Sequence, residues 1–136
     1  MPSACEPDTY LVVGDDSAAP EWVEPLCQIA LNWKKGDRSI VQHFGNASPD
    51  LSDKRFPALV RAYLSHHPAL INAWQGYSED KRTSPSPYLD GRTVGFFEVL
   101  NGKGRHRDVR QYRDRATACA DFIFREALWV LAKRQR

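Results

Sequence analysis

The fold is decided by a stretch near the C-terminus, TVGFFEVL-NGKG-RHRDVRQYR, which runs from Thr93 to Arg113. A run of β-branched and aromatic residues is followed by four residues with two glycines and then by a second segment of similar length. Because glycine tolerates positive φ, the residues Asn101-Gly-Lys-Gly104 suit a four-residue hairpin turn. The pattern therefore predicts an antiparallel β-hairpin over about residues 93–113.

A long helix is predicted directly after the hairpin. Asp114 can cap it, and it runs to about Arg134. Its apolar positions are Ala116, Cys119, Ala120, Ile123, Ala127, Val130 and Leu131, widened by Phe122, Phe124, Leu128 and Trp129. Only Asp121 and Arg125 make a persistent polar edge, so the helix is almost entirely apolar. We expect the sheet to cover one side and earlier helices the other, unless a partner protein covers part of it.

Further upstream, apolar residues recur at three- and four-residue spacings, which predicts amphipathic helices. The first begins near Glu24 and ends at Gly36. The second begins at Phe56 and ends before Pro68, because the residue preceding a proline disfavours helical backbone. Pro68 can itself begin another short helix, which Gly76 stops.

Three remaining segments complete the predicted architecture. Residues 9–13 form a short β-branched run that suits a strand. After Asp37, a short helix closed by Gly45 is predicted, with a strand over residues 39–44 as the alternative. The segment between Tyr77 and Gly91 is charged and proline-rich, so we expect a surface loop. The chain as a whole (1–136) is predicted to be a single α+β domain, with a small antiparallel sheet packed against several helices.

Composition narrows the class of protein. Of the 136 residues, 42% are hydrophobic and 11% aromatic, which favours a folded core over disorder. No apolar run approaches the roughly 18 residues of a membrane span, and the N-terminus lacks the features of a signal peptide. The cysteines, Cys5, Cys27 and Cys119, are odd in number and far apart, which fits neither a disulfide framework nor a zinc cluster. We expect a soluble cytoplasmic protein with reduced thiols, no cofactor and no membrane partner.

Charge is unevenly distributed along the chain, although the net charge is only +2. Residues 1–24 carry six acidic side chains and no basic one, whereas residues 103–136 carry ten basic and four acidic side chains. Such asymmetry can steer an oppositely charged partner over about 8 Å at physiological salt, or it can simply be solvated surface.

The candidate catalytic and metal motifs fail on geometry. His66 and His67 are adjacent on a helix and point about 100° apart, whereas two ligands on one face need spacings of three or four. A nuclease-type hairpin needs an acidic residue and a lysine two positions apart on a strand, but Leu100 stands at that offset from Glu98. Interaction of helix-terminal histidines with the helix dipole explains the pair without a metal ion.

Phosphate binding and nucleophilic catalysis fail in the same way. The segment NGKG joins two strands, whereas a phosphate loop joins a strand to a helix and places Ser or Thr after its lysine. No serine lies in a Gly-x-Ser-x-Gly elbow. Cys27 and Cys119 lie on apolar helix faces, where thiols are usually inert. We therefore expect no catalytic and no metal-binding residues, and no enzymatic activity.

A basic segment is the strongest functional signal from the residues themselves. Its members are Lys103, Arg105, Arg107, Arg110, Arg113 and Arg115. On a regular strand Arg105, Arg107 and Arg113 share one face and Arg110 lies on the other, which divides the positive stripe. Nucleic-acid binding through the 103–115 segment, by phosphate contacts and aromatic stacking, is one function that this segment suggests.

The segments Val94-Gly-Phe-Phe-Glu-Val99 and Ala116-Thr-Ala-Cys-Ala-Asp-Phe-Ile123, separated by a turn and a second strand, resemble the C-terminal part of small α+β immunity proteins. These proteins neutralise polymorphic toxins that bacteria deliver into competing cells. The resemblance covers about 45 residues as a pattern and carries no residue-level motif. It implies a cytoplasmic, non-enzymatic protein that binds a toxin and blocks its active site.

Candidate partner-binding residues follow from this interpretation. Acidic side chains near the N-terminus can imitate the phosphates of a toxin's substrate, the expected loop can enter a cleft, and arginines are common at interfaces. The candidates are Asp15, Asp16, Glu21, Glu79, Asp80, Tyr88, Arg105 and Arg107. The leading prediction is an inhibitor of a cognate toxin, and the alternative is a basic nucleic-acid-binding module.

Overall fold

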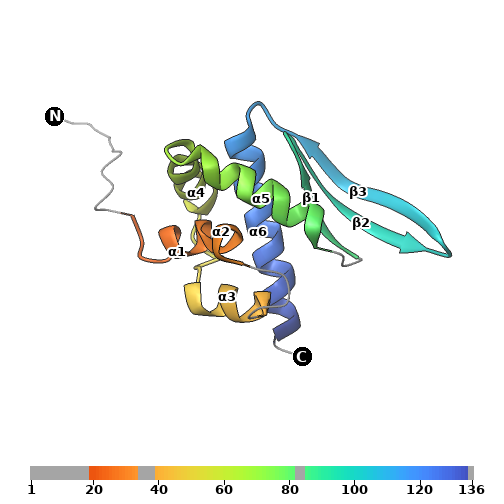
Figure 1. Ribbon diagram of the computed structural model, residues 1–136, viewed down its shortest axis with the longest axis horizontal. Helices are drawn as coiled ribbons and strands as arrows, with labels where there is room; N and C mark the ends of the chain where they lie inside the picture. The colour runs from red at the N-terminus through yellow and green to blue at the C-terminus, as the bar shows by residue number, and fades with distance from the viewer. Residues whose placement is uncertain (1–18, 34–38, 82–84, 135–136) are drawn as a thin grey trace.

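The structure, a computed structural model, describes residues 19–33, 39–81 and 85–134 (Figure 1). The helices of these residues are α1 (Val23–Cys27), α2 (Ile29–Asn32), α3 (Ile40–Ala47), α4 (Phe56–Ser65), α5 (Pro68–Asp80) and α6 (Arg115–Arg134). The strands are β1 (Ser86–Asp90), β2 (Thr93–Leu100) and β3 (Lys103–Gln111), which pair antiparallel in the order β1-β2-β3. The α+β class and the antiparallel sheet predicted from the sequence are confirmed.

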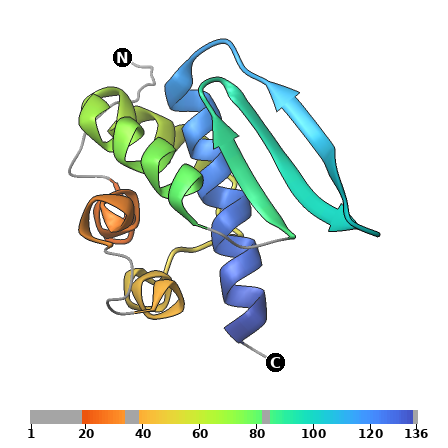
Figure 2. The ribbon, with the colours of Figure 1, turned by 45° about the vertical axis from the view of Figure 1, so that its right-hand side comes forward.

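Helix α6 lies at the centre of the molecule, between the other helices and the sheet (Figure 2). It contacts α3, α4 and α5 as well as β1 and β2. Asp114 caps its first turn, because the Asp114 Oδ1 accepts hydrogen bonds from the backbone N–H and the hydroxyl of Thr117, both at 2.8 Å. The two-sided packing of this helix agrees with the sequence pattern.

The near-complete apolarity expected of α6 is not confirmed. Asp121 and Arg125 form an ion pair of 3.1 Å one turn apart. Glu126 is an acidic residue within the apolar stretch of this helix, and it is buried in the protein interior. Leu128 keeps 46% of its surface exposed. The helix therefore buries two faces but retains a polar and partly open side.

Trp74 of α5 organises the core on the helical side of α6. Its Nε1 donates a hydrogen bond of 2.9 Å to the carbonyl oxygen of Cys27. Its ring lies 6.2 Å from that of Phe44 and 6.0 Å from that of Phe122. One fully buried side chain thus connects α1, α3, α5 and α6, and its polar atom is satisfied by a helix-end carbonyl.

A buried ion pair joins the end of α5 to α6. The Glu126 Oε1 accepts a hydrogen bond from the Lys81 Nζ at 2.6 Å, and its Oε2 accepts one from the Tyr77 hydroxyl at 2.5 Å. The Lys81 Nζ also lies 5.3 Å from the centroid of the Phe122 ring. A buried carboxylate needs such partners, because desolvation would otherwise make its charged form very costly.

The surface loop expected between Tyr77 and Gly91 is wrong over most of its length. Helix α5 continues through Gly76 to Asp80, and residues 86–90 form β1. Glycine inside a helix costs about 1 kcal/mol, but burial of the next residue, Tyr77, more than offsets this. Proline suits an edge strand, so Pro87 does not prevent β1 from pairing with β2.

Side chains of α5 cover the outer edge of β1. The Ser78 hydroxyl accepts a hydrogen bond from the Leu89 N–H at 2.8 Å. The Gln75 side chain donates to the Leu89 carbonyl and accepts from the Gly91 N–H. These bonds satisfy backbone groups that an uncovered edge strand would leave open. At the opposite edge of the sheet, the nine residues of β3 are all exposed.

The remaining helices differ from the predictions mainly at their ends. Residues 23–32 form two short helices in place of one. The segment after Ser39 is a helix and not the alternative strand, because the Ser39 hydroxyl caps it at 3.2 Å. That helix passes through Gly45 and ends where Ser48 adopts a left-handed φ of 50°. The strand expected at residues 9–13, and Asp37, lie outside the described residues.

Loss of the buried cation should destabilise the fold. We expect Lys81→Met to lower the free energy of unfolding by about 3 kcal/mol, because it leaves the Glu126 carboxylate buried without its charge partner. Urea denaturation of both proteins measures the difference. The exposed Lys54 provides the matched control, and Lys54→Met should change stability by less than about 0.5 kcal/mol. Equal effects of the two substitutions would contradict this role of the ion pair.

Candidate protein-binding surface

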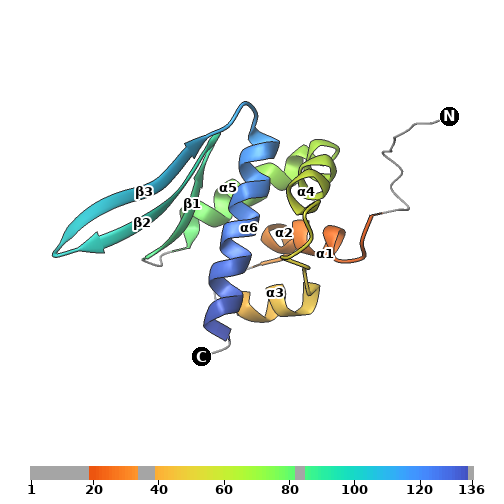
Figure 3. The same ribbon diagram turned by 180° about the vertical axis from the view of Figure 1, so that it is seen from behind.

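The β2–β3 hairpin projects beyond the helices (Figure 3). We call its outer part, residues 96–107, the arm. Asn101 and Gly102 form its turn, with φ values of 53° and 77°, and Leu100 pairs with Lys103. The turn therefore has two residues, and the predicted four-residue turn is wrong. An Asn-Gly pair with both φ values positive matches the twist of the two strands, so the pairing extends to the tip.

A β-bulge at Asp108 decides which side chains share a face of the arm. Asp108 adopts a φ of 54°, and the pairing jumps from Phe96↔Arg107 to Val94↔Arg110. Two residues of β3 therefore oppose one of β2. Val94 and Phe96 lie on the same face of β2, so their partners Arg107 and Arg110 also share a face. The predicted separation of Arg110 from the other arginines of this strand is wrong.

Glu98 holds two of these arginines in place. Its Oε1 accepts a hydrogen bond from the Arg107 Nε at 2.7 Å, and its Oε2 accepts one from the Arg105 guanidinium at 2.9 Å. The Glu98 side chain is 13% exposed, whereas Arg105 and Arg107 are 57% and 47% exposed. The carboxylate is therefore largely covered while both guanidinium groups still face solvent.

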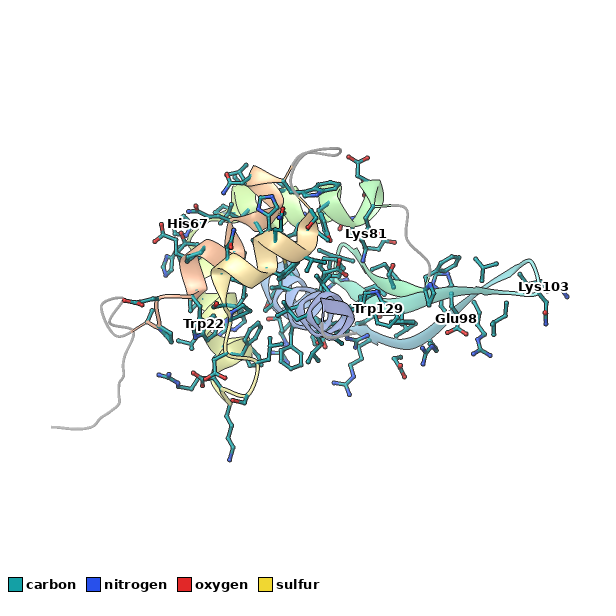
Figure 4. The ribbon with its side chains drawn as sticks, turned by 90° about the horizontal axis from the view of Figure 1, so that it is seen from below. Trp22, His67, Lys81, Glu98, Lys103 and Trp129 are labelled. Carbon is teal, nitrogen blue, oxygen red and sulfur yellow. The ribbon has the colours of Figure 1, made fainter. Side chains whose placement is uncertain are left out.

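The arm is attached to α6 through its base. The rings of Phe96 and Trp129 meet edge to face at 5.1 Å, and the Arg107 guanidinium lies 4.3 Å from the centroid of the Phe96 ring. Arg125 donates a hydrogen bond of 2.8 Å to the carbonyl oxygen of Asp108, at the bulge. Figure 4 shows Trp129 where the arm leaves the body, Glu98 further out and Lys103 at the tip.

An open groove lies between this face of the arm and the C-terminal half of α6. Its volume is about 400 Å³, and its lining comprises Pro87, Phe96, Asp108, Arg125, Leu128, Trp129 and Ala132. Apolar side chains form its floor, and the charged side chains of Asp108 and Arg125 stand at its border. We refer to it as the arm groove.

The opposite face of the sheet carries a small aromatic cluster. Tyr88, Phe97 and His106 come from three adjacent strands, and the His106 Nδ1 is hydrogen-bonded to the Tyr88 hydroxyl at 3.0 Å. The ring of His106 lies 5.2 Å from Tyr88 and 5.1 Å from Phe97. A Cβ on Gly95 would lie 2.6 Å from the Tyr88 hydroxyl, so only glycine leaves room for this packing.

Among the described residues, the predicted partner-binding side chains do not form one continuous surface. Glu79 and Asp80 are exposed at the end of α5, and Glu21 is exposed just before α1. Arg105 and Arg107 lie together on Glu98, whereas Tyr88 lies on the opposite face of the sheet. Asp15 and Asp16 fall outside the described residues.

The sequence patterns did not indicate which residues position Arg105 and Arg107. Glu98 contacts both arginines and Phe96 contacts Arg107. Arg125 and Trp129 attach the hairpin to α6. The Asn-Gly pair could have indicated the contact of Glu98 with Arg105, because a two-residue turn fixes the register and puts these residues opposite each other. The contact of Phe96 with Trp129 had no such signal, because it depends on how the sheet crosses α6.

Of the candidate metal ligands and nucleophiles, His67, Cys27 and Cys119 are engaged in packing, and His66 is exposed. The His67 ring stacks on Tyr63 at 4.2 Å, and its Nδ1 lies 2.8 Å from the Tyr63 carbonyl oxygen. Burial raises the pKa of the Cys27 thiol from 9.0 to about 12, and burial followed by the nearby Cys27 raises that of Cys119. Both thiols are therefore protonated and poorly nucleophilic at neutral pH.

Two absences apply to the described part of the chain. No three His, Cys, Asp or Glu side chains there are grouped closely enough to hold a metal ion. Among the same residues, no helix has the length and hydropathy needed to cross a membrane.

No protein-family model matches the chain, and no curated protein or solved structure matches it significantly.

The buried thiols predict how stability depends on pH. Because the folded state raises the pKa values of Cys27 and Cys119, it holds their protons more tightly than the unfolded state does. Each thiol contributes stability that is fully present below about pH 9. For Cys27 that contribution falls by about 1.4 kcal/mol per pH unit between about pH 9 and about pH 12, and the Cys119 contribution falls in the same direction. Urea denaturation at several pH values between about 8 and 11 should show this decline, and Cys27→Ala/Cys119→Ala should make it shallower. An unchanged slope in the double variant would contradict the assignment.

Proposed function

We propose that this protein is a cytoplasmic, non-enzymatic inhibitor of a bacterial toxin, an immunity protein that binds the toxin and blocks its active site. The observation that carries the proposal is the arm. It projects from the body, its strand β3 is exposed throughout, and internal contacts hold its charged side chains. A projecting element whose side chains are already held by internal contacts loses less conformational entropy when it enters or covers a cleft in a partner.

The residue types on the arm support a protein partner. Arginine and large aromatic side chains contribute most to binding energy at protein interfaces. Arg107 is fixed between Glu98 and the ring of Phe96, so it loses little rotamer freedom when a partner binds. Val99 and Leu100, each about half exposed, add apolar contact area near the tip.

Nucleic-acid binding is the second candidate, and one observation favours it. The bulge brings Arg110 onto the face that carries Lys103, Arg105 and Arg107, and a two-stranded β-ribbon fits the major groove of DNA. Against this, Glu98 pairs with two of the arginines and would repel the phosphates that they contact. We therefore rank the protein partner first.

The test uses a toxin domain encoded next to the gene. We expect co-expression of the two proteins to restore bacterial growth, and size-exclusion chromatography to show a stoichiometric complex. Arg105→Ala/Arg107→Ala should weaken that complex by about tenfold or more, because both exposed guanidinium groups are lost. Arg61→Ala, at an exposed position of α4, is the matched control and should leave affinity and growth unchanged.

Two results would reject the toxin proposal. One is failure of the wild-type protein to bind or neutralise the neighbouring toxin. The other is equally tight, strongly salt-dependent binding to generic duplex DNA that the arginine substitutions abolish, which would instead establish the nucleic-acid module.

A further inference from the structure

The apolar floor of the arm groove includes side chains of α6 that are partly exposed, although α6 is the central helix of the core. Leu128 is 46% exposed although it lies in the middle of α6, and Trp129 beside it is only partly buried under Phe96. Leu128 and Ala132 are one helical turn apart and both line the groove. This spacing forms a ridge of the kind against which a second helix packs.

The groove itself is lined by one acidic and one basic side chain, Asp108 and Arg125. The strand face beside it carries the basic residues Lys103, Arg105, Arg107 and Arg110 and the acidic residue Glu98. Arg105 and Arg107 are each about half exposed, and their positions are fixed by Glu98. Arg125 is fixed by Asp121 and by the Asp108 carbonyl oxygen. An arginine has five N–H donors, so each of these guanidinium groups retains donors for a further carboxylate.

These features discriminate between possible occupants. A second copy of the chain that paired with β3 would bring its own Arg105 and Arg107 close to these arginines, and like charges repel. An added β-strand would meet the bulge at Asp108, where the regular ladder is interrupted. A nucleic acid gains little from the aliphatic surface of Leu128. An acidic helix with an apolar face complements the apolar floor and the arginines on the strand face beside it.

We propose that the arm groove binds an acidic amphipathic helix of a partner protein, whose apolar side chains pack on Phe96, Leu128 and Trp129 and whose carboxylates pair with Arg105 and Arg107. This inference rests on the proposed function for its protein partner and adds the surface and the chemistry of recognition. A groove of about 400 Å³ accommodates a few side chains from one face of such a helix.

The probe is a fluorescein-labelled synthetic peptide of about 14 residues, which spans about 21 Å as a helix. It carries Glu on one face and Leu on the other. A second peptide replaces each Glu with Lys, and a third replaces each Leu with Ser. Fluorescence anisotropy with the full-length protein should show saturable binding of the first peptide and much weaker binding of the other two, because the site needs both negative charge and apolar surface.

Two matched substitution pairs locate the site. Leu128→Ala should weaken binding of the acidic peptide about fivefold, whereas Leu31→Ala, at a leucine of α2 that is 60% exposed, should not. Arg107→Gln should weaken it by a similar factor, whereas Arg61→Gln should not. Circular dichroism confirms that each variant is folded.

The outcomes separate this inference from the toxin proposal. Absence of peptide binding by the wild-type protein, equal binding of the Lys peptide, or unchanged binding by Leu128→Ala and Arg107→Gln would overturn the groove assignment. Growth rescue from the neighbouring toxin would still support the proposed function in that case. Peptide binding that depends on Leu128 and Arg107, in a protein that does not neutralise the toxin, would support the groove and reject the toxin.

Discussion

Helix α6 buries side chains in two directions at once, and most of the architecture follows from this requirement. Phe122 packs against Trp74 on the helical side, while Trp129 meets Phe96 on the side of the sheet. A single layer could cover only one of these faces, so the chain supplies helices for one and a small sheet for the other. Only β1 and the base of β2 are needed for that cover. The outer hairpin extends beyond that cover and forms the arm.

Two glutamates show how the same side chain serves different ends in this fold. Glu126 is buried and accepts hydrogen bonds from Lys81 and Tyr77. Lys81 neutralises its charge inside the protein, and these contacts join α6 to the end of α5. Glu98 lies on the arm and meets two arginines that remain exposed. The first arrangement contributes to stability, whereas the second fixes charged groups at the surface without hiding them. Fixed, exposed guanidinium groups are what a recognition surface requires.

The sequence patterns predicted the elements whose stability is local, and they failed where tertiary contacts decide. The hairpin, the helix after Phe56 and the capped C-terminal helix all carry strong periodicity or turn signals. Gly76 was taken as a helix end, although burial of Tyr77 carries the helix past it. For the candidate surface, the basic residues were evident in the sequence, but the groove was not. Its floor depends on where the sheet crosses α6, and no local pattern encodes that crossing.

The backbone conformation of Asp108, at the bulge, determines which charged side chains of β3 share a face of the sheet. A left-handed aspartate costs roughly 1–2 kcal/mol relative to regular strand backbone, and the hydrogen bond from Arg125 to the Asp108 carbonyl helps to offset this strain. Without the extra residue, alternation would turn Arg110 toward the face of Tyr88 and His106. With it, Arg110 and Arg107 lie on the helix side and the aromatic cluster lies on the other. The arginine that anchors the bulge, Arg125, also lines the arm groove, so one side chain of α6 supports both the strand irregularity and the groove beside it.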